Sequence, residues 1–280
     1  MRLMVRRHVD AAGFLDHAEA WLLESEAEHN LLLGIAHAVA RGRADYQAPL
    51  YFATIERDGE IAGCAYRTPP FKLGLTRMPL DAIPLLVQDV EKCYTELPAV
   101  LGPEQEAATF AETWADRRGL RYHEGMRQRI YQLDRVLQPA STPPGRLLVA
   151  SPEHADLVAD WIDAFSREAG IADIRGRSIA QSRIAEKVLF LWQNDEPVSL
   201  AGWSARSPNG MRIGPVYTPP SHRGRGYASA VTAGASQRAL DQGVRFCFLY
   251  TDLANPTSNS IYQRIGYAPV CDVMDWTFET

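Results

Sequence analysis

The sequence is poor in the residues and segments that mark metal-binding, secreted and membrane proteins. Its 280 residues include only four cysteines, Cys64, Cys93, Cys247 and Cys271. None of them forms a Cys-x-x-Cys pair or has histidines at ligand spacing. No apolar run approaches the roughly 20 residues that cross a bilayer, and no N-terminal segment has the apolar core of a signal peptide. We therefore expect reduced thiols, no metal, no membrane partner and a cytoplasmic location.

An excess of positive charge is also lacking. The formal net charge is −5 at pH 7, which argues against nucleic acid as a partner and leaves cationic amines as candidate substrates. Apolar residues make up 46% of the chain, so a sizeable core can form. The length fits one large or two ordinary domains.

The most informative segment covers residues 216–228, with the sequence VYTPPSHRGRGYA. It predicts a strand, a tight glycine loop and the start of a helix. Gly224 and Gly226 allow a positive φ and a close approach of the backbone to an anion. Free N–H groups and the positive end of the helix attract phosphate, and Arg223 and Arg225 strengthen that attraction. The segment therefore predicts a phosphate-binding loop.

Two common phosphate loops do not fit this segment. A dinucleotide fingerprint would need glycine at Ser229 and an acid about 20 residues further on, at the end of a strand. Asp241 is close in count, but it lies just before Gly243, where the helix should end. A P-loop would need Gly-Lys-Ser/Thr, which is absent here.

The loop fits a different pattern, Arg-x-x-Gly-x-Ala, at Arg223, Gly226 and Ala228 after an apolar strand. This resembles the coenzyme A pyrophosphate loop of the GCN5-related N-acetyltransferase (GNAT) family. After a strand at 245–251, residues 255–267 (NPTSNSIYQRIGY) resemble the family's second pattern, Asn-x-x-Ala/Ser-x-x-x-Tyr-x-x-x-Gly-Phe/Tyr. The two motifs in this order are a strong signal.

The second motif also has a plain physical meaning. Asn255 suits a helix N-cap and Pro256 the first helical position. Tyr262 follows Asn255 by seven residues, about two turns, and so lies on the same face. Gly266 is expected to end the helix. Asn255, Ser258 and Tyr262 would then form a polar stripe along a cofactor groove.

The resemblance implies transfer of the acetyl group of acetyl-CoA, as co-substrate, to a primary amine by direct attack, with proximity lowering the barrier. It implies that a main-chain N–H near Val216 stabilises the oxyanion and that Tyr262 is the general acid for the leaving thiolate. The residues expected to hold the pantetheine arm and pyrophosphate are Val216, Tyr217, Thr218, Arg223, Gly224, Arg225, Gly226, Tyr227, Ala228, Ser229, Asn255 and Ser258.

The general base is not evident from the sequence. Many GNAT proteins carry a glutamate on the strand before the phosphate loop, but residues 211–216 contain no acid. Deprotonation is expected to run through water, or through Asp252 or Glu168, the nearest candidates by position. The acceptor, a small-molecule or peptide amine, has no signature, and the resemblance is compatible with a homodimer.

A proline-rich segment, residues 139–145 (PASTPPG), predicts a linker that separates residues 1–138 from residues 146–280. A faint internal repeat relates residues 58–65 to residues 196–203, each with the pattern of a hairpin turn followed by a strand. We therefore predict an α+β fold with a mixed, mostly antiparallel sheet flanked by helices, in two GNAT-like domains in tandem.

The two predicted domains are not equivalent. Residues 68–79 stand where the first phosphate loop would fall, and they lack Arg-x-x-Gly-x-Gly/Ala. Trp114 stands where the tyrosine of the second motif would fall. We therefore predict that residues 1–138 form a degenerate domain that does not bind the cofactor, and that residues 146–280 form the catalytic domain.

The second half is predicted to follow the order β-α-α-β-β-β-α-β-α-β. The strands are expected at 146–150, 187–193, 198–206, 211–217, 245–251 and 268–278. The helices are expected at 152–165, near 178–186, at 224–242 and at 256–264.

Simpler alternatives remain for single residues and for the whole chain. Tyr262 can be a core aromatic, Asn255 is first a helix cap, and His222 is a loop residue rather than a base. A non-catalytic acyl-CoA-binding sensor is the main alternative function, favoured by the missing glutamate. Dinucleotide or nucleotide-sugar binding through the same loop is a further alternative.

Overall fold

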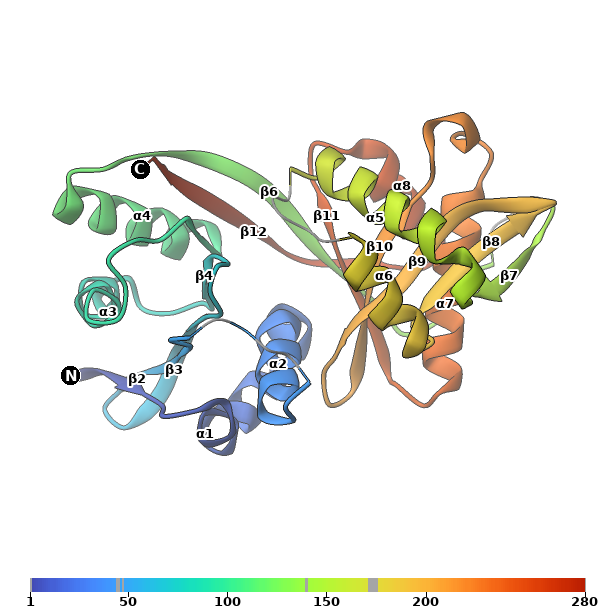
Figure 1. The fold of residues 1–280 in the computed structure, drawn as a ribbon. Helices are drawn as coiled ribbons and strands as arrows, with labels where there is room; N and C mark the ends of the chain where they lie inside the picture. Colours follow the sequence, from blue (N-terminus) through green and yellow to red (C-terminus); the bar gives the residue numbers. More distant parts are fainter. Residues whose placement is uncertain (1, 44–45, 47, 139–140, 171–175, 280) are drawn as a thin grey trace. The chain divides into compact units, whose positions relative to one another are not determined.

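The computed structural model describes residues 2–43, 46, 48–138, 141–170 and 176–279 (Figure 1). The chain groups into two compact units that are not consecutive in sequence. Unit 1 contains Met1–Ile130, Tyr250–Asn255 and Pro269–Thr280, and unit 2 contains Tyr131–Leu249 and Pro256–Ala268. Part of the predicted linker, residues 139–140, lies outside the described residues.

Unit 1 is built from the first half of the chain in the order β-α-α-β-β-β-α-β-α-β. Its elements are β1 (Leu3–Arg7), α1 (Ala11–Leu23), α2 (Glu26–Ala40), β2 (Tyr51–Arg57), β3 (Glu60–Arg67), β4 (Leu73–Leu75), the 3-10 turn η1 (Leu80–Ala82), α3 (Ile83–Val90), β5 (Ala99–Gly102), α4 (Glu104–Arg118) and β6 (Arg121–Leu133), whose last three residues are grouped with unit 2.

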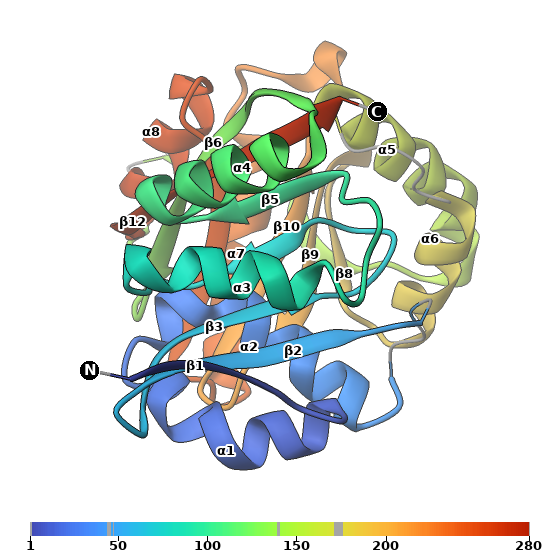
Figure 2. The ribbon, with the colours of Figure 1, turned by 90° about the vertical axis from the view of Figure 1, so that its left-hand side faces the viewer.

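The sheet of unit 1 is antiparallel from β1 to β4 and parallel between β4 and β5. The last strand of the chain, β12 (Ala268–Glu279), pairs antiparallel with β5 in this sheet, from Met274↔Gly102 to Thr277↔Ala99. Helices α3 and α4 pack on one face through a core that includes Tyr51 and Trp114. Helices α1 and α2 pack on the other face around Phe52, as Figure 2 shows.

Unit 2 repeats the element order of unit 1 up to the last helix. Its elements are β7 (Arg146–Val149), the 3-10 turn η2 (Pro152–His154), α5 (Ala155–Glu168), α6 (Gly176–Ala185), β8 (Leu189–Asn194), β9 (Glu196–Arg206), β10 (Gly210–Tyr217), the 3-10 turn η3 (Pro220–His222), α7 (Tyr227–Asp241), β11 (Phe246–Asp252), whose last three residues are grouped with unit 1, and α8 (Pro256–Arg264).

The predicted elements of the second half are all confirmed, with small shifts at their ends. The helix expected from residue 224 begins at Tyr227, because Gly224 and Gly226 adopt positive φ angles of 76° and 82° that an α-helix does not allow. The helix expected from residue 152 begins with the η2 turn before α5 starts at Ala155.

The sheet of unit 2 has the order β7-β8-β9-β10-β11. The first three pairings are antiparallel and the last is parallel. One face packs on α5 and α6 around Leu200 and Tyr217, and the other packs on α7 around Trp203 and Ile213. The expected fold class, α+β with a mostly antiparallel sheet flanked by helices, is confirmed. Within the described residues, every helix is too short or too polar to cross a membrane.

Candidate functional site

Strands β10 and β11 are paired over only a short distance. The parallel pairing joins Gly210↔Phe246 through Arg212↔Phe248, and β10 continues beside β9 as far as Tyr217. The register with β9 also shifts around Gly214, whose φ is 153°. Among the described residues, the last part of β10 therefore has no ladder partner on the β11 side. The carbonyl oxygens of Gly214 and Tyr217 accept side-chain hydrogen bonds, and the other main-chain groups of this segment can pair with an extended ligand.

The end of β10 is held in place by a buried side chain. Ser199 on β9 is fully buried, and its hydroxyl donates to the carbonyl oxygen of Tyr217 at 3.2 Å. The same hydroxyl shares a hydrogen bond with the hydroxyl of Thr218 at 2.7 Å. These contacts fix the point at which the chain leaves the strand and enters the glycine loop.

The glycine loop ends at a helix start with free donors. Helix α7 makes its first main-chain hydrogen bond from Ala230 to the carbonyl of Gly226, at 3.1 Å. The N–H groups of Tyr227, Ala228 and Ser229 precede that bond, so the helix supplies no carbonyl for them. Among the described residues, no atom lies within 4 Å of the position that a Cβ on Gly224 would take. Glycine is therefore required there by the positive φ and not by a lack of space.

Tyr227 anchors this helix start. Its side chain is only 4% exposed, and Asn194 on β8 donates to its hydroxyl at 3.0 Å. Of the predicted cofactor-binding residues, Tyr227 therefore offers its main chain and not its side chain.

The two loop arginines differ. Arg223 donates through Nε to the carbonyl of Thr218 at 2.9 Å and through Nη2 to both carboxylate oxygens of Glu168 at 2.8 and 2.7 Å. Arg225 is exposed and forms no ion pair with any described residue. Tyr217 donates to Glu168 at 3.4 Å, and burial together with the charge of Glu168 raises the pKa of Tyr217. Arg223 thus stabilises the loop, while Arg225 remains available.

Tyr262 lies on α8 in the core beneath α7 and is 8% exposed. Its ring centroid is 6.5 Å from that of Tyr131 and 6.1 Å from that of Tyr267. Burial raises the pKa of Tyr262 to about 12, so the phenol keeps its proton at neutral pH. Ser258 lies one turn earlier on the same helix, and Asn255 directly precedes the helix, which begins at Pro256 as predicted.

The two candidate bases are both engaged in local structure. Glu168 ends α5 and forms the ion pair with Arg223, in which the side chains are 50% and 48% exposed. Asp252 ends β11, and its carboxylate accepts the main-chain N–H of Ala254 at 2.8 Å. Both candidate carboxylates therefore already accept hydrogen bonds within the protein.

The corresponding loop of the first half has a different construction. In unit 2, the four residues 223–226 separate η3 from α7, whereas in unit 1 the η1 turn runs directly into α3 at Ile83. The N–H of Met78 in this shorter loop already donates to the carboxylate of Glu106, at 3.3 Å. The loop after β4 therefore lacks the glycines of the loop after β10, and at least one of its N–H groups is already paired.

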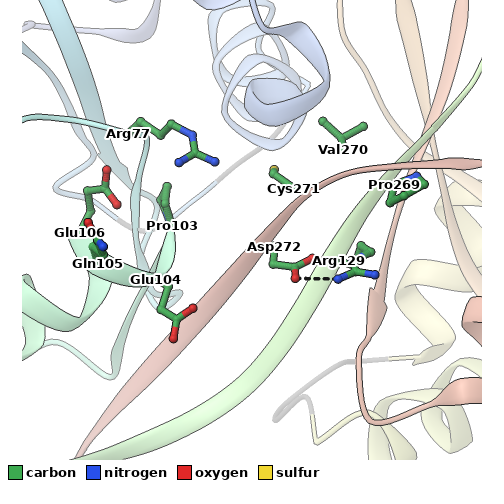
Figure 3. A pocket seen from close by; sticks show the side chains of 10 residues that line it. All are labelled: Arg77, Pro103, Glu104, Gln105, Glu106, Arg129, Pro269, Val270, Cys271 and Asp272. Atoms are coloured by element: carbon green, nitrogen blue, oxygen red, sulfur yellow. Dashed lines mark hydrogen bonds and ion pairs between the residues drawn. The ribbon is translucent and has the colours of Figure 1, made fainter.

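A cavity of about 650 Å³ lies within unit 1 (Figure 3). Two of its arginines are in ion pairs. Arg129 donates to both oxygens of Asp272 at 2.6 and 2.8 Å, and this contact lowers the pKa of Asp272. Arg77 pairs with Glu28 at 3.2 Å. Burial raises the pKa of the neighbouring Cys271 thiol to about 12, so the thiol is unreactive at neutral pH.

Some residues that shape the site carry no sequence signal. Ser199 and Asn194 are ordinary polar residues of strands, and only the folded sheet brings them to the loop. The partnership of Glu168 with Arg223 spans 55 positions, and no local pattern encodes it.

The structure has the fold of GNAT acetyltransferases. Residues 189–276 match the family model of FR47-like proteins, which are related to GNAT proteins. The resemblance inferred from the two motifs is confirmed. A comparison with curated proteins found no match.

Solved structures show the same fold over nearly the whole chain. A GNAT acetyltransferase of Colwellia psychrerythraea is 12% identical with a TM-score of 0.62, covering 99% of this chain and 100% of its own. A GCN5-related N-acetyltransferase of Sphaerobacter thermophilus is 19% identical with a TM-score of 0.65, covering 98% and 94%. A tandem GNAT protein of the clavulanic acid pathway is 13% identical with a TM-score of 0.56, covering 99% and 98%. The tandem arrangement fits this chain.

Proposed function

We propose that residues 146–280 catalyse transfer of the acetyl group of acetyl-CoA to a primary amine of a small molecule or peptide. One observation carries this proposal: β10 leaves β11 after Arg212 and leads, through a loop with two positive-φ glycines, to the uncapped start of α7. An exposed strand edge followed by free helix N–H groups suits a ligand that is a polar chain ending in a diphosphate.

The residues present fit acetyl-CoA, which would supply the activated acetyl thioester. Main-chain groups of Val216 and Thr218 would pair with the pantetheine arm as with an added strand. The N–H groups of residues 224–229 would hold the pyrophosphate, and Arg225, which has no ion-pair partner among the described residues, would neutralise part of its charge. Arg223 would act by fixing the loop through Glu168 and Thr218.

Tyr262 would stabilise the leaving thiolate. Its pKa of about 12 lies above the value of about 8.5 that is typical of a thiol, so full proton transfer to the thiolate is uphill. A hydrogen bond from the phenol to the developing negative charge avoids that cost. We therefore assign Tyr262 the role of a hydrogen-bond donor in the catalytic site, with water completing the protonation.

The acceptor amine would lose its proton to water. Strand β10 contains no acid, and the carboxylates of Glu168 and Asp252 are occupied by Arg223 and by the turn at Ala254. This arrangement favours amines that are already neutral in part at the working pH, since no side-chain base is then needed.

We further propose that residues 1–138 form a GNAT-like domain that does not bind the cofactor, joined by residues 139–145 to the catalytic part. The direct connection of η1 to α3 and the bond from Met78 to Glu106 support this proposal. The Glu106 carboxylate, which contacts the loop after β4, would also repel a diphosphate.

A non-catalytic acyl-CoA sensor is the second candidate, favoured by the absence of an acid on β10. Release of free thiol from acetyl-CoA, measured with a panel of amines, separates the two functions. Thiol release above background with any amine supports the transferase. Tight binding of acetyl-CoA without thiol release for every amine supports the sensor, and preferential binding of NAD would contradict both.

A further inference from the structure

Two arginines share one face of the unit 2 sheet close to the bulge of β10. Ser204 and Arg212 alternate with Trp203 and Met211, whose side chains face α7, so Ser204 and Arg212 lie on the α5–α6 face. Arg212 donates through Nε to the hydroxyl of Ser204 at 2.9 Å. Arg183 reaches the same face from α6.

Arg183 bonds to the bulge itself. Its Nη1 donates to the carbonyl oxygen of Gly214 at 3.3 Å. Partial burial and the positive charge of the nearby Arg212 both lower the pKa of Arg183, so the two guanidinium groups are close enough to repel each other. Two like charges held together out of bulk water are unfavourable unless an anion joins them.

No carboxylate of the described residues forms an ion pair with either arginine. The charge of Glu186 acts on Arg183, but the Glu186 carboxylate accepts a hydrogen bond from Ser182 at 3.2 Å instead. The guanidinium donors that Gly214 and Ser204 do not use are therefore available to a ligand.

The position of Arg183 and Arg212 indicates which ligand would carry the anionic group. Gly214 precedes Val216 by only two residues, so Arg183 contacts β10 next to the proposed reaction centre. The acetyl group and the pantetheine arm carry no charge, and the pyrophosphate loop lies at the far end of β10, beyond Tyr217. The anion must then belong to the acceptor.

We propose that Arg183 and Arg212 bind an oxyanionic group of the acceptor, so that the substrate is an amine that also carries a carboxylate or a phosphate. This proposal rests on the proposed acetyl transfer for its biological meaning. The anion site itself is a property of the folded protein and is open to measurement without turnover.

The direct test is a titration of the arginine Nε–H resonances by NMR with sodium acetate and, separately, with inorganic phosphate, at constant ionic strength set by sodium chloride. We expect saturable shifts of two resonances that are absent from Arg183→Gln and Arg212→Gln. Arg177→Gln is the matched control, because Arg177 lies on the same helix and its side chain is 71% exposed. Shifts that do not saturate would overturn the proposal. Shifts that persist when Arg183→Gln and Arg212→Gln are combined in one protein would also overturn it.

A kinetic test uses paired amines that differ in charge, glycine with glycinamide and phosphoethanolamine with ethanolamine. The acidic member of the preferred pair is expected to have a KM about 10- to 100-fold lower, the range of a hydrogen bond to a charged group. A lower KM for glycine than for glycinamide would indicate a carboxylate site, and a lower KM for phosphoethanolamine than for ethanolamine would indicate a phosphate site. Arg183→Gln should remove the preference with kcat retained, and Arg183→Lys should restore part of it.

The two tests separate this proposal from the proposed function. Equal KM values within both amine pairs would overturn the anion site. A fall in the kcat of Arg183→Gln for acidic and neutral amines alike would also overturn it, because that result would assign Arg183 to stabilisation of the oxyanion. If no amine releases thiol, the transferase assignment fails, and the NMR titration still decides whether the arginine pair binds an anion.

Discussion

Both carboxylate oxygens of Glu168 accept hydrogen bonds from Nη2 of Arg223, at 2.8 and 2.7 Å. This pair joins the end of α5 to the loop that precedes α7, so the arginine of the phosphate-loop motif is fixed before any ligand arrives. It also gives Glu168 a role other than that of a general base. A positioning role and a base role differ in their kinetic consequences.

Glu168→Gln tests that difference. Because the pair is about half exposed, its loss is expected to raise the KM for acetyl-CoA only about 2- to 5-fold, in the range of an exposed ion pair. The kcat and its pH profile should stay unchanged in steady-state assays, with the exposed Glu153→Gln as control. A fall in kcat of about 100-fold or more, typical of a lost general base, would show that Glu168 is catalytic.

Gly226→Ala is expected to weaken acetyl-CoA binding by about 10-fold. Alanine disfavours the φ of 82°, and the resulting shift of the loop should remove about one hydrogen bond to the charged pyrophosphate. The strain should also lower stability by about 1–2 kcal/mol. Gly243→Ala is the matched control: Gly243 lies after the other end of α7, with a φ of 87° and open space around its Cβ. Calorimetry with acetyl-CoA should show reduced affinity for Gly226→Ala alone, and equal affinities would contradict the loop's role.

Tyr262→Phe is expected to lower kcat by about 100-fold while the KM for acetyl-CoA changes little, as stopped assays of thiol release can measure. Since the pKa of Tyr262 is raised to about 12, the wild-type kcat should show no tyrosine ionisation below pH 10. An ionisation below pH 10 that disappears in Tyr262→Phe would refute the assigned pKa.

The same pKa predicts a change of stability at high pH. The folded pKa of Tyr262, about 12, lies above the unfolded value of about 10. The contribution of the neutral phenol is therefore fully present below pH 10 and is lost as the pH rises from about 10 through 12. Urea unfolding midpoints should fall less steeply over that interval in Tyr262→Phe than in the wild type. Identical slopes would contradict the burial of this hydroxyl.

Gly125→Ala tests the attachment of β12 to unit 1. Asp275 on β12 is 3% exposed, accepts the N–H of Met126 at 2.8 Å and pairs with Lys72. A Cβ on Gly125 would overlap the Asp275 carboxylate, so alanine should lower the free energy of unfolding by about 1–3 kcal/mol. Gly13→Ala, in helix α1 without a close contact, should leave it unchanged or raise it. Equal thermal midpoints for both variants would contradict the packing at Asp275.

The second half could be predicted element by element because its signals are local. Pro256 and Gly266 bracket α8, and Gly224 and Gly226 mark the start of α7, each through the backbone angles that the residue allows or prohibits. The glycine positions therefore predicted the positive-φ loop as well as the element order. These are properties of single residues, which the sequence displays directly.

Contacts between distant segments could not be predicted in the same way. The sequence predicts the strand at 268–278 but not its pairing with β5. The alternation of apolar and polar side chains indicates a strand without indicating which strand it pairs with. The bond from Met78 to Glu106 and the ion pair of Glu168 with Arg223 likewise depend on tertiary packing. The contacts of the two candidate bases, Glu168 with Arg223 and Asp252 with Ala254, also depend on the folded chain and have no pattern in the sequence.

A crystal structure of the protein grown with acetyl-CoA tests the proposed cofactor site directly. We expect one molecule whose pyrophosphate accepts hydrogen bonds from the N–H groups of residues 224–229 and whose pantetheine arm follows Val216 to Thr218. Pyrophosphate bound instead at the loop after β4, or a β10 edge without ligand at saturating acetyl-CoA, would contradict it.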